Sequence, residues 1–171
     1  AVGGRAGRPE PPCGGGQGWA YGGGGHNCGK QRVRLEAERG IVNVVDDQTG
    51  SPTWSHNLAH GLLALASSDA AAGTYHATNG GETTWHGFAR AVFEELGADP
   101  GRVQATTSQE FRRPAPRPAY SVLSARAWTD ADLPRFQAWR AALTEAFLPD
   151  GYAIRGREQV PADPPGNRYG G

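Results

Sequence analysis

The stretch from Ile41 to Trp54 constrains the fold of this chain more than any other, because an apolar run passes directly into a polar turn. The run from Ile41 to Val45 is rich in β-branched residues, which is typical of a buried strand. Gly50 is free to take a positive φ and Pro52 has a fixed φ, so the strand is expected to end before them. The sequence therefore predicts a short buried strand followed by a tight turn.

The turn concentrates hydrogen-bonding side chains at the carboxyl end of this strand. They are two carboxylates, one amide and three hydroxyls: Asp46, Asp47, Gln48, Thr49, Ser51 and Thr53. In open α/β proteins ligands bind at this end of the strands, so the turn is a candidate binding site. The alternative interpretation is an ordinary strand-to-helix loop, in which Ser55 or Thr53 caps the next helix. The residue types alone leave both interpretations open.

Apolar periodicity predicts the remaining elements. Strands are expected at residues 73–78 and 103–107, with Trp19 to Tyr21 as the end of another, and helices at 30–39, 57–66 and 85–96. Leu58, Leu62 and Leu65 are spaced so that one stripe of the helix over 57–66 faces the core. Pro134 is expected to open a last helix. The apolar face of that helix comprises Phe136, Trp139, Ala142, Leu143 and Phe147.

Composition limits the size of the folded unit and its general partners. The 171 residues include 26 glycines and 13 prolines, so we expect one small domain, with residues 1–17 and 149–171 disordered. Seventeen basic and 17 acidic side chains cancel, so no global field attracts nucleic acid or an anionic membrane. The longest apolar run, residues 62–66, is far too short to span a bilayer.

The cysteines, histidines and glycine-rich run indicate neither a metal site nor a nucleotide-binding loop. Cys13 and Cys28 lack metal-type spacing and follow no signal region, so we expect a cytoplasmic protein with free thiols. A disulfide between the two is the alternative. His76 and His86 have no carboxylate or second histidine at ligand spacing on the same element, so we interpret them as structural and expect no metal. The run from Gly22 to Gly25 lacks the strand and the spacing of a dinucleotide fingerprint.

Four motifs carry a resemblance to a known family. In chain order they are Asp47-Gln48-x-Gly50-x-Pro52-Thr53, Gly73-Thr-Tyr-His76, Thr84-Trp85-x-x-Phe88-Ala89 and Arg117-Pro118-x-x-Ser121. Their order and spacing resemble the C-terminal half of dTDP-4-dehydrorhamnose reductase, an extended short-chain dehydrogenase/reductase, over residues 18–148. The resemblance implies an α/β substrate-binding lobe of a Rossmann-type enzyme, with short strands and about four helices.

The resemblance also implies a ligand and the residues that contact it. The ligand is a dTDP-sugar nucleotide, and the implied substrate-binding residues are Trp19, Asp47, Gln48, Ser51, Pro52, Thr53 and Arg117. Arg117 would meet the diphosphate, because its planar fork donates two parallel hydrogen bonds. The alternative is a solvated arginine on a loop that also carries Arg112 and Arg113. Trp19 would stack on the nucleotide or serve as a loose anchor.

The reaction implied by the resemblance is the NADPH-dependent reduction of dTDP-4-dehydro-L-rhamnose to dTDP-L-rhamnose. The family uses a Tyr-x-x-x-Lys pair, whereas Lys30 follows Tyr21 by nine positions. We therefore assign no catalytic residue and expect no NADPH binding by this chain alone. Two hypotheses follow: a truncated or divergent reductase that retains the sugar-nucleotide-binding part, or a non-catalytic nucleotide-sugar-binding or pairing module. The resemblance further allows a homodimer.

Overall fold

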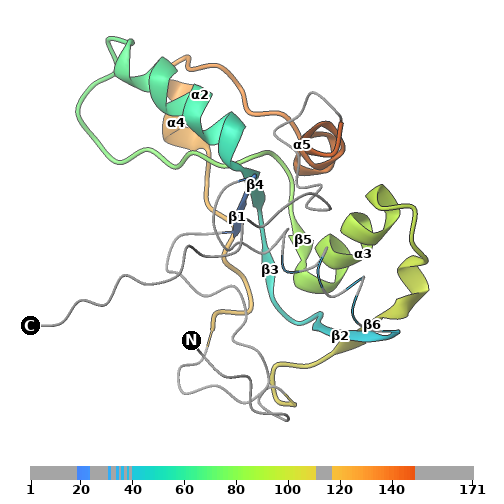
Figure 1. The fold of residues 1–171 in the computed structure, drawn as a ribbon. Coiled ribbons are helices and arrows are strands. Elements are labelled where there is room, and N and C mark those ends of the chain that lie inside the picture. Colours follow the sequence, from blue (N-terminus) through green and yellow to red (C-terminus); the bar gives the residue numbers. More distant parts are fainter. Residues whose placement is uncertain are drawn as a thin grey trace, which may run out of the picture.

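The computed structural model describes residues 19–23, 31, 34, 36, 38, 40–110 and 117–148. Its strands form three two-stranded sheets (Figure 1). The pairs are β1 (Trp19–Tyr21) parallel to β4 (Pro52–Trp54), β2 (Val42–Val45) parallel to β6 (Val103–Thr106), and β3 (Thr49–Gly50) antiparallel to β5 (Thr83–Thr84). Residues 42–54 thus give one strand to each sheet, which makes this stretch the centre of the fold.

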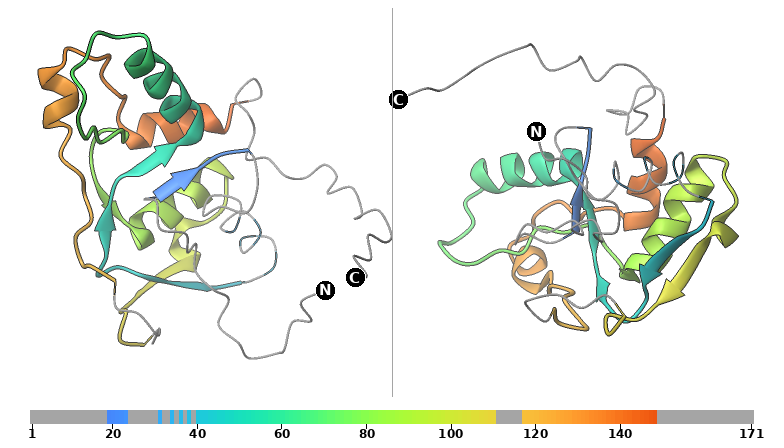
Figure 2. Two further views of the ribbon diagram at one scale, coloured as in Figure 1. Left: turned by 90° about the vertical axis from the view of Figure 1, so that its left-hand side faces the viewer. Right: turned by 60° about the horizontal axis from the view of Figure 1, so that its bottom comes forward.

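Within the described ranges, five continuous helical segments lie around the sheets. They are α2 (Ser55–Ala66), α3 (Trp85–Glu95), the 3-10 turn η1 (Pro100–Arg102), α4 (Arg126–Asp130) and α5 (Trp139–Ala146). Figure 2 shows α2 and α4 together at one end of the molecule, with β2 and β6 at the other end. The predicted α/β class with about four helices is confirmed.

The core is centred on α3, whose sequence contains its own start and stop signals. The Thr84 hydroxyl accepts a hydrogen bond from the Gly87 backbone N–H at 3.0 Å and so caps the helix. Gly97 ends it with a φ of 70°. Phe88 and Phe93 are fully buried, and the burial of each side chain contributes about 1.5–3 kcal/mol to the stability of the fold. The predicted helix over 85–96 and the predicted strands 41–45 and 103–107 are confirmed within one residue at each end.

The last helix begins later than predicted. Pro134 does not open it, because the chain is held extended just before Trp139 by a β-bridge between Gly80 and Ala138. Gly80 donates its N–H to the Gln137 carbonyl at 2.9 Å, and Trp139 donates to the Gly80 carbonyl at 2.8 Å. The helix therefore starts where this bridge releases the backbone.

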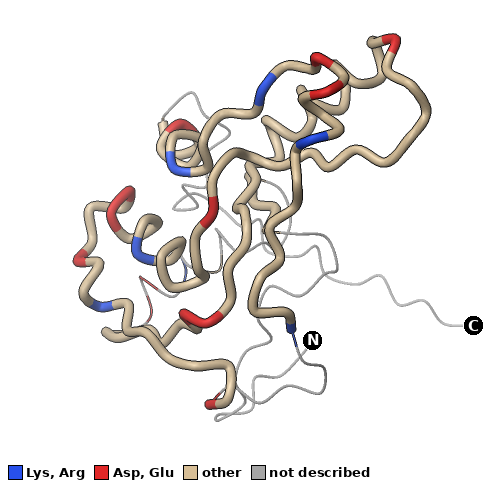
Figure 3. The backbone as a smooth tube through the Cα atoms, turned by 180° about the vertical axis from the view of Figure 1, so that it is seen from behind, with Lys and Arg blue, Asp and Glu red and all other residues tan. Residues whose placement is uncertain are grey.

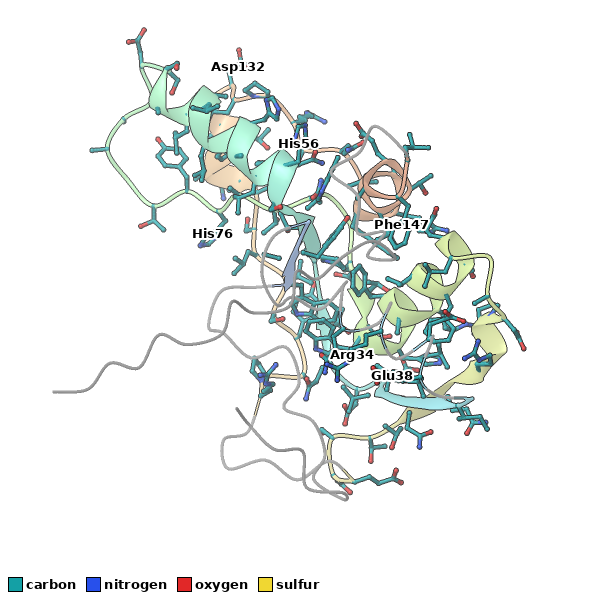
Figure 4. The ribbon with its side chains drawn as sticks, viewed as in Figure 1. Arg34, Glu38, His56, His76, Asp132 and Phe147 are labelled. Atoms are coloured by element: carbon teal, nitrogen blue, oxygen red, sulfur yellow. The ribbon has the colours of Figure 1, made fainter. Side chains whose placement is uncertain are left out.

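Two further predictions are wrong. Residues 73–78 form no strand, since no described segment pairs with them; the His76 ring instead meets the Ser124 carbonyl at 3.1 Å (Figure 4). The stripe of α2 is not buried in the core: Leu58 and Leu65 are half-buried, Leu62 is 51% exposed, and Gly61 is the only buried residue of the helix. Neither Thr53 nor Ser55 caps α2, whose N-cap is Trp54 without a side-chain hydrogen bond.

Other predictions lie wholly or partly outside the described residues. Of the predicted helix over 30–39, the described positions are helical: Gln31, Arg34, Glu36 and Glu38. The predictions for residues 1–17, for residues 149–171 and for the two cysteines fall outside. Figure 3 shows acidic and basic positions interspersed along the described chain. No described helix is both long and apolar enough to cross a bilayer.

Candidate functional site

The polar turn is built from two very short strands that belong to different sheets. Thr49 pairs with Thr84 on one side and forms a parallel bridge with Tyr120 on the other. Three residues further on, Pro52 begins β4, which pairs with Trp19. The turn is therefore fixed along both edges by backbone hydrogen bonds, and its side chains are held in set directions.

Two of the three hydroxyls of the turn are used inside the protein. Thr53 donates from its hydroxyl to the Ser51 carbonyl at 3.1 Å, and Ser51 donates from its hydroxyl to the Gly81 carbonyl at 2.8 Å. Gln48, Ser51, Pro52 and Thr53 are all buried. These predicted site residues shape the turn from within, and their side chains present little surface to solvent.

Asn79, which the sequence analysis did not single out, connects the end of the turn to the segment around Gln137. Its side-chain oxygen accepts the Trp54 N–H at 2.9 Å, and its side-chain nitrogen donates to the Gln137 carbonyl at 3.0 Å. Its own backbone N–H donates to the Thr53 hydroxyl at 3.2 Å. The residue is only 1% exposed. The sequence Asn79-Gly80-Gly81 is typical of a simple turn and gives no sign of this buried role.

Gly50 of the turn is required by the position of Trp19. The Trp19 ring stacks on Trp85, with centroids 3.7 Å apart and planes inclined by 6°. A Cβ atom on Gly50 would lie 2.3 Å from two atoms of the Trp19 ring. Only glycine permits this approach. Trp19 is buried, and its ring packs against Gly50 of the turn.

The carboxylates before the turn have separate partners. Asp47 accepts two hydrogen bonds from Ser108, from the hydroxyl at 2.7 Å and from the backbone N–H at 2.8 Å. These bonds hold the pKa of the exposed Asp47 carboxyl below its usual range. Asp46 accepts from the Thr84 hydroxyl and lies 3.5 Å from the His86 ring. Both carboxylates thus brace β2 against its neighbours.

The loop that carries Arg117 lies directly against the turn. Thr49 donates its N–H to the Ala119 carbonyl at 2.7 Å, and its own carbonyl accepts from the Ser121 N–H at 2.9 Å. The exposed Tyr120 donates a hydrogen bond from its hydroxyl to the Glu82 carboxylate at 2.6 Å. This bond is a further contact between the loop and the segment that leads into β5. The loop is thus joined to the turn through its backbone at Ala119 and Ser121, two and four residues after the exposed Arg117. Arg112 and Arg113 lie outside the described residues.

Comparison with known proteins places this arrangement in a family. Residues 17–150 match the RmlD substrate binding domain family. The chain belongs to that family. A dTDP-4-dehydrorhamnose reductase from Streptomyces griseus is 52% identical over 133 residues, which cover 75% of this chain and 44% of the relative. A dTDP-4-keto-6-deoxy-D-glucose reductase from Streptomyces niveus is 46% identical, with the same two coverages.

A solved structure supports the same assignment. The dTDP-4-dehydrorhamnose reductase from Bacillus anthracis, crystallised in complex with NADP, superposes with a TM-score of 0.69 at 32% identity. The superposition covers 73% of this chain and 44% of that protein. This member of the RmlD substrate binding domain family thus spans under half the length of the relatives it matches.

The described part of this RmlD substrate binding domain includes no lysine that could pair with a tyrosine. Tyr21 is 1% exposed, its hydroxyl has no hydrogen-bond partner among the described residues, and burial raises its pKa well above the usual range. The only lysine of the sequence is Lys30, which is not among the described residues. The described residues contain no group of three metal-ligating side chains. What the geometry offers is a rigid polar turn joined to the loop that carries Arg117.

Proposed function

We propose that this chain provides the sugar-nucleotide-binding lobe of a dTDP-4-dehydrorhamnose reductase. The observation that carries the proposal is the pair of backbone hydrogen bonds between Thr49 of the turn and residues 119–121, which begin two residues after Arg117. The family membership and the names of the relatives support the same ligand class.

The proposed ligand suits this surface chemically. A thymidine diphosphate joins an aromatic base to a compact double anion, so recognition needs hydrogen-bonding groups and a forked cation. Arg117 is the proposed contact of the diphosphate. Asp47 is ionised and can accept hydrogen bonds from the base or the sugar. Both side chains belong to exposed residues, so each is accessible to a ligand.

The other predicted substrate residues take a supporting part in this proposal. Gln48, Ser51, Pro52 and Thr53 are buried and set the course of the turn. Trp19 has one ring face covered by Trp85, and it holds Gly50. Direct stacking of Trp19 on the nucleotide stays a prediction.

The described residues do not fit NADPH. A dinucleotide is bound where a strand runs through a glycine fingerprint into a helix. Neither of the two parallel strand pairs has this arrangement among the described residues. The buried Tyr21 hydroxyl has no lysine beside it among the described residues. We therefore assign no proton or hydride step to these residues. A binding module without catalysis of its own is the second candidate function, and this misfit favours it.

Titration of the purified chain with dTDP tests the proposal. We expect a dissociation constant near 1 mM, roughly 4 kcal/mol, because one lobe leaves much of the ligand in water. Arg117→Ala should weaken binding by about 1.5–3 kcal/mol if the charged hydrogen bonds form. Arg126→Ala is the matched control, since Arg126 is 87% exposed on α4. Equal affinity of the Arg117→Ala variant and the parent would remove the assignment.

An activity assay tests whether the chain has catalytic activity of its own. The purified chain should not oxidise NADPH in the presence of dTDP-4-dehydro-L-rhamnose, because no residue is assigned to hold the cofactor or move a proton. Turnover above a buffer blank would contradict this expectation and restore an enzymatic role.

A further inference from the structure

Helix α2 carries two histidines on one face, directly after the polar turn. His56 and His60 are four positions apart within the helix, so both side chains lie on the same side of it. Their rings contact each other edge to face, with centroids 4.5 Å apart. The two imidazoles can therefore reach a common point beside the helix.

The buried ring of Trp54 restricts the first of these histidines. Trp54 is 2% exposed, and its backbone N–H donates to the side-chain oxygen of Asn79 at 2.9 Å. Its ring centroid lies 4.7 Å from that of His56, which is labelled in Figure 4. His56 is half-buried, whereas His60 is exposed. The pair is thus packed against the protein on one side and open to solvent on the other.

The chemistry of this pair suits a late first-row divalent cation. Imidazole nitrogen is a good ligand for Zn²⁺, Ni²⁺ and Cu²⁺, whereas Mg²⁺ and Ca²⁺ prefer oxygen. Two histidines at this spacing on one helix bind a single Zn²⁺ in zinc enzymes. Helix α2 contains no lysine or arginine that would repel a cation. Both the ligand type and its surroundings therefore favour metal binding.

The residue between the two histidines that matters for catalysis is absent. In the zinc enzymes a glutamate directly follows the first histidine and acts as the general base. Asn57 holds this position in α2, and an amide does not take up a proton in this way. The pair therefore offers a binding site without a base for hydrolysis.

We propose that His56 and His60 together bind one Zn²⁺, Ni²⁺ or Cu²⁺ ion, with water at the remaining coordination positions. Each imidazole has two ring nitrogens, so a metal on one nitrogen leaves the other for a hydrogen bond. The expectation of no metal rested on His76 and His86, which lie on separate segments, and this pair revises it. The inference concerns α2 alone and does not depend on dTDP binding.

Titration of the purified chain with NiCl₂, followed by the loss of amide NMR signals, tests this site. Ni²⁺ is paramagnetic, so the amides nearest the bound ion broaden first, and we expect these to be residues 54–62. His60→Ala should weaken Ni²⁺ binding about 10- to 100-fold, since loss of even an outer partner of a metal ligand has an effect of this size. Zn²⁺ should compete for the site, whereas Mg²⁺ at the same concentration should not.

The matched control moves the second histidine to another face of the helix. The double variant His60→Ala/Leu62→His keeps two histidines on α2 but places them six positions apart, where they cannot share an ion. His60 and Leu62 are both exposed, so each variant should melt within about 2 °C of the parent. Both variants should show the same weakened Ni²⁺ binding. The proposal is overturned if either variant binds Ni²⁺ as tightly as the parent, if broadening begins away from α2, or if the parent binds no Ni²⁺.

Discussion

Replacement of Asn79 by alanine should strongly destabilise the protein, although Asn79 is not one of the residues proposed to contact the ligand. The change removes the acceptor of the Trp54 N–H and the donor to the Gln137 carbonyl. Each lost partner leaves a backbone group without its hydrogen bond in a site that is 1% exposed at Asn79. One such unsatisfied buried group costs about 1–3 kcal/mol. The two together give an expected loss of roughly 2–5 kcal/mol.

Urea denaturation followed by tryptophan fluorescence measures this loss. Asn43→Ala is the control, because Asn43 is exposed on β2 and its substitution should stay within about 0.5 kcal/mol. The midpoint should fall for Asn79→Ala with an unchanged slope. A loss below 1 kcal/mol, or one equal to that of the control, would refute the view that Asn79 joins the turn to the segment before α5.

Two other substitutions test the turn itself. Gly50→Ala should cost about 1–3 kcal/mol and weaken the near-ultraviolet circular dichroism of the Trp19–Trp85 pair, because the new Cβ would lie 2.3 Å from the Trp19 ring; a neutral effect in denaturation would contradict that contact. Ser108→Ala should raise the pKa of Asp47 toward its ordinary value of about 3.9, measured by carboxyl NMR titration. Because the folded-state pKa is depressed, the stabilisation is present above about pH 4 and is lost as the pH falls through the folded-state pKa; identical titration of variant and parent would show that Ser108 does not hold this carboxylate.

Local signals made α3 and the strand before the turn predictable. The cap at Thr84, the apolar face of α3 and the stop at Gly97 are all within one short stretch of sequence. Periodicity indicates that Leu58, Leu62 and Leu65 share one face of α2, but it could not give the direction of that face, which leaves Leu62 exposed and the other two half-buried. The direction depends on Gly61 meeting Phe136, which is 75 positions further along the chain.

The sequence predicts the residue types of the candidate site but not the contacts that hold them. The resemblance implies the turn and Arg117 as ligand contacts, yet the hydroxyls of Ser51 and Thr53 form internal hydrogen bonds. Ser108 lies 61 positions from its partner Asp47, so no local pattern could reveal the pair. Contacts of this range follow from the fold and cannot be deduced from the motif.

The most direct test of the proposed function is a map of backbone amide shifts during titration with dTDP. The turn and the loop of residues 117–121 are joined through Thr49, so the amide shifts of both should change together when dTDP binds. The amides of residues 47–53 and 117–121 should shift together and give a single dissociation constant. Shifts scattered over the molecule, or confined to segments such as α5, would contradict a nucleotide site at this turn.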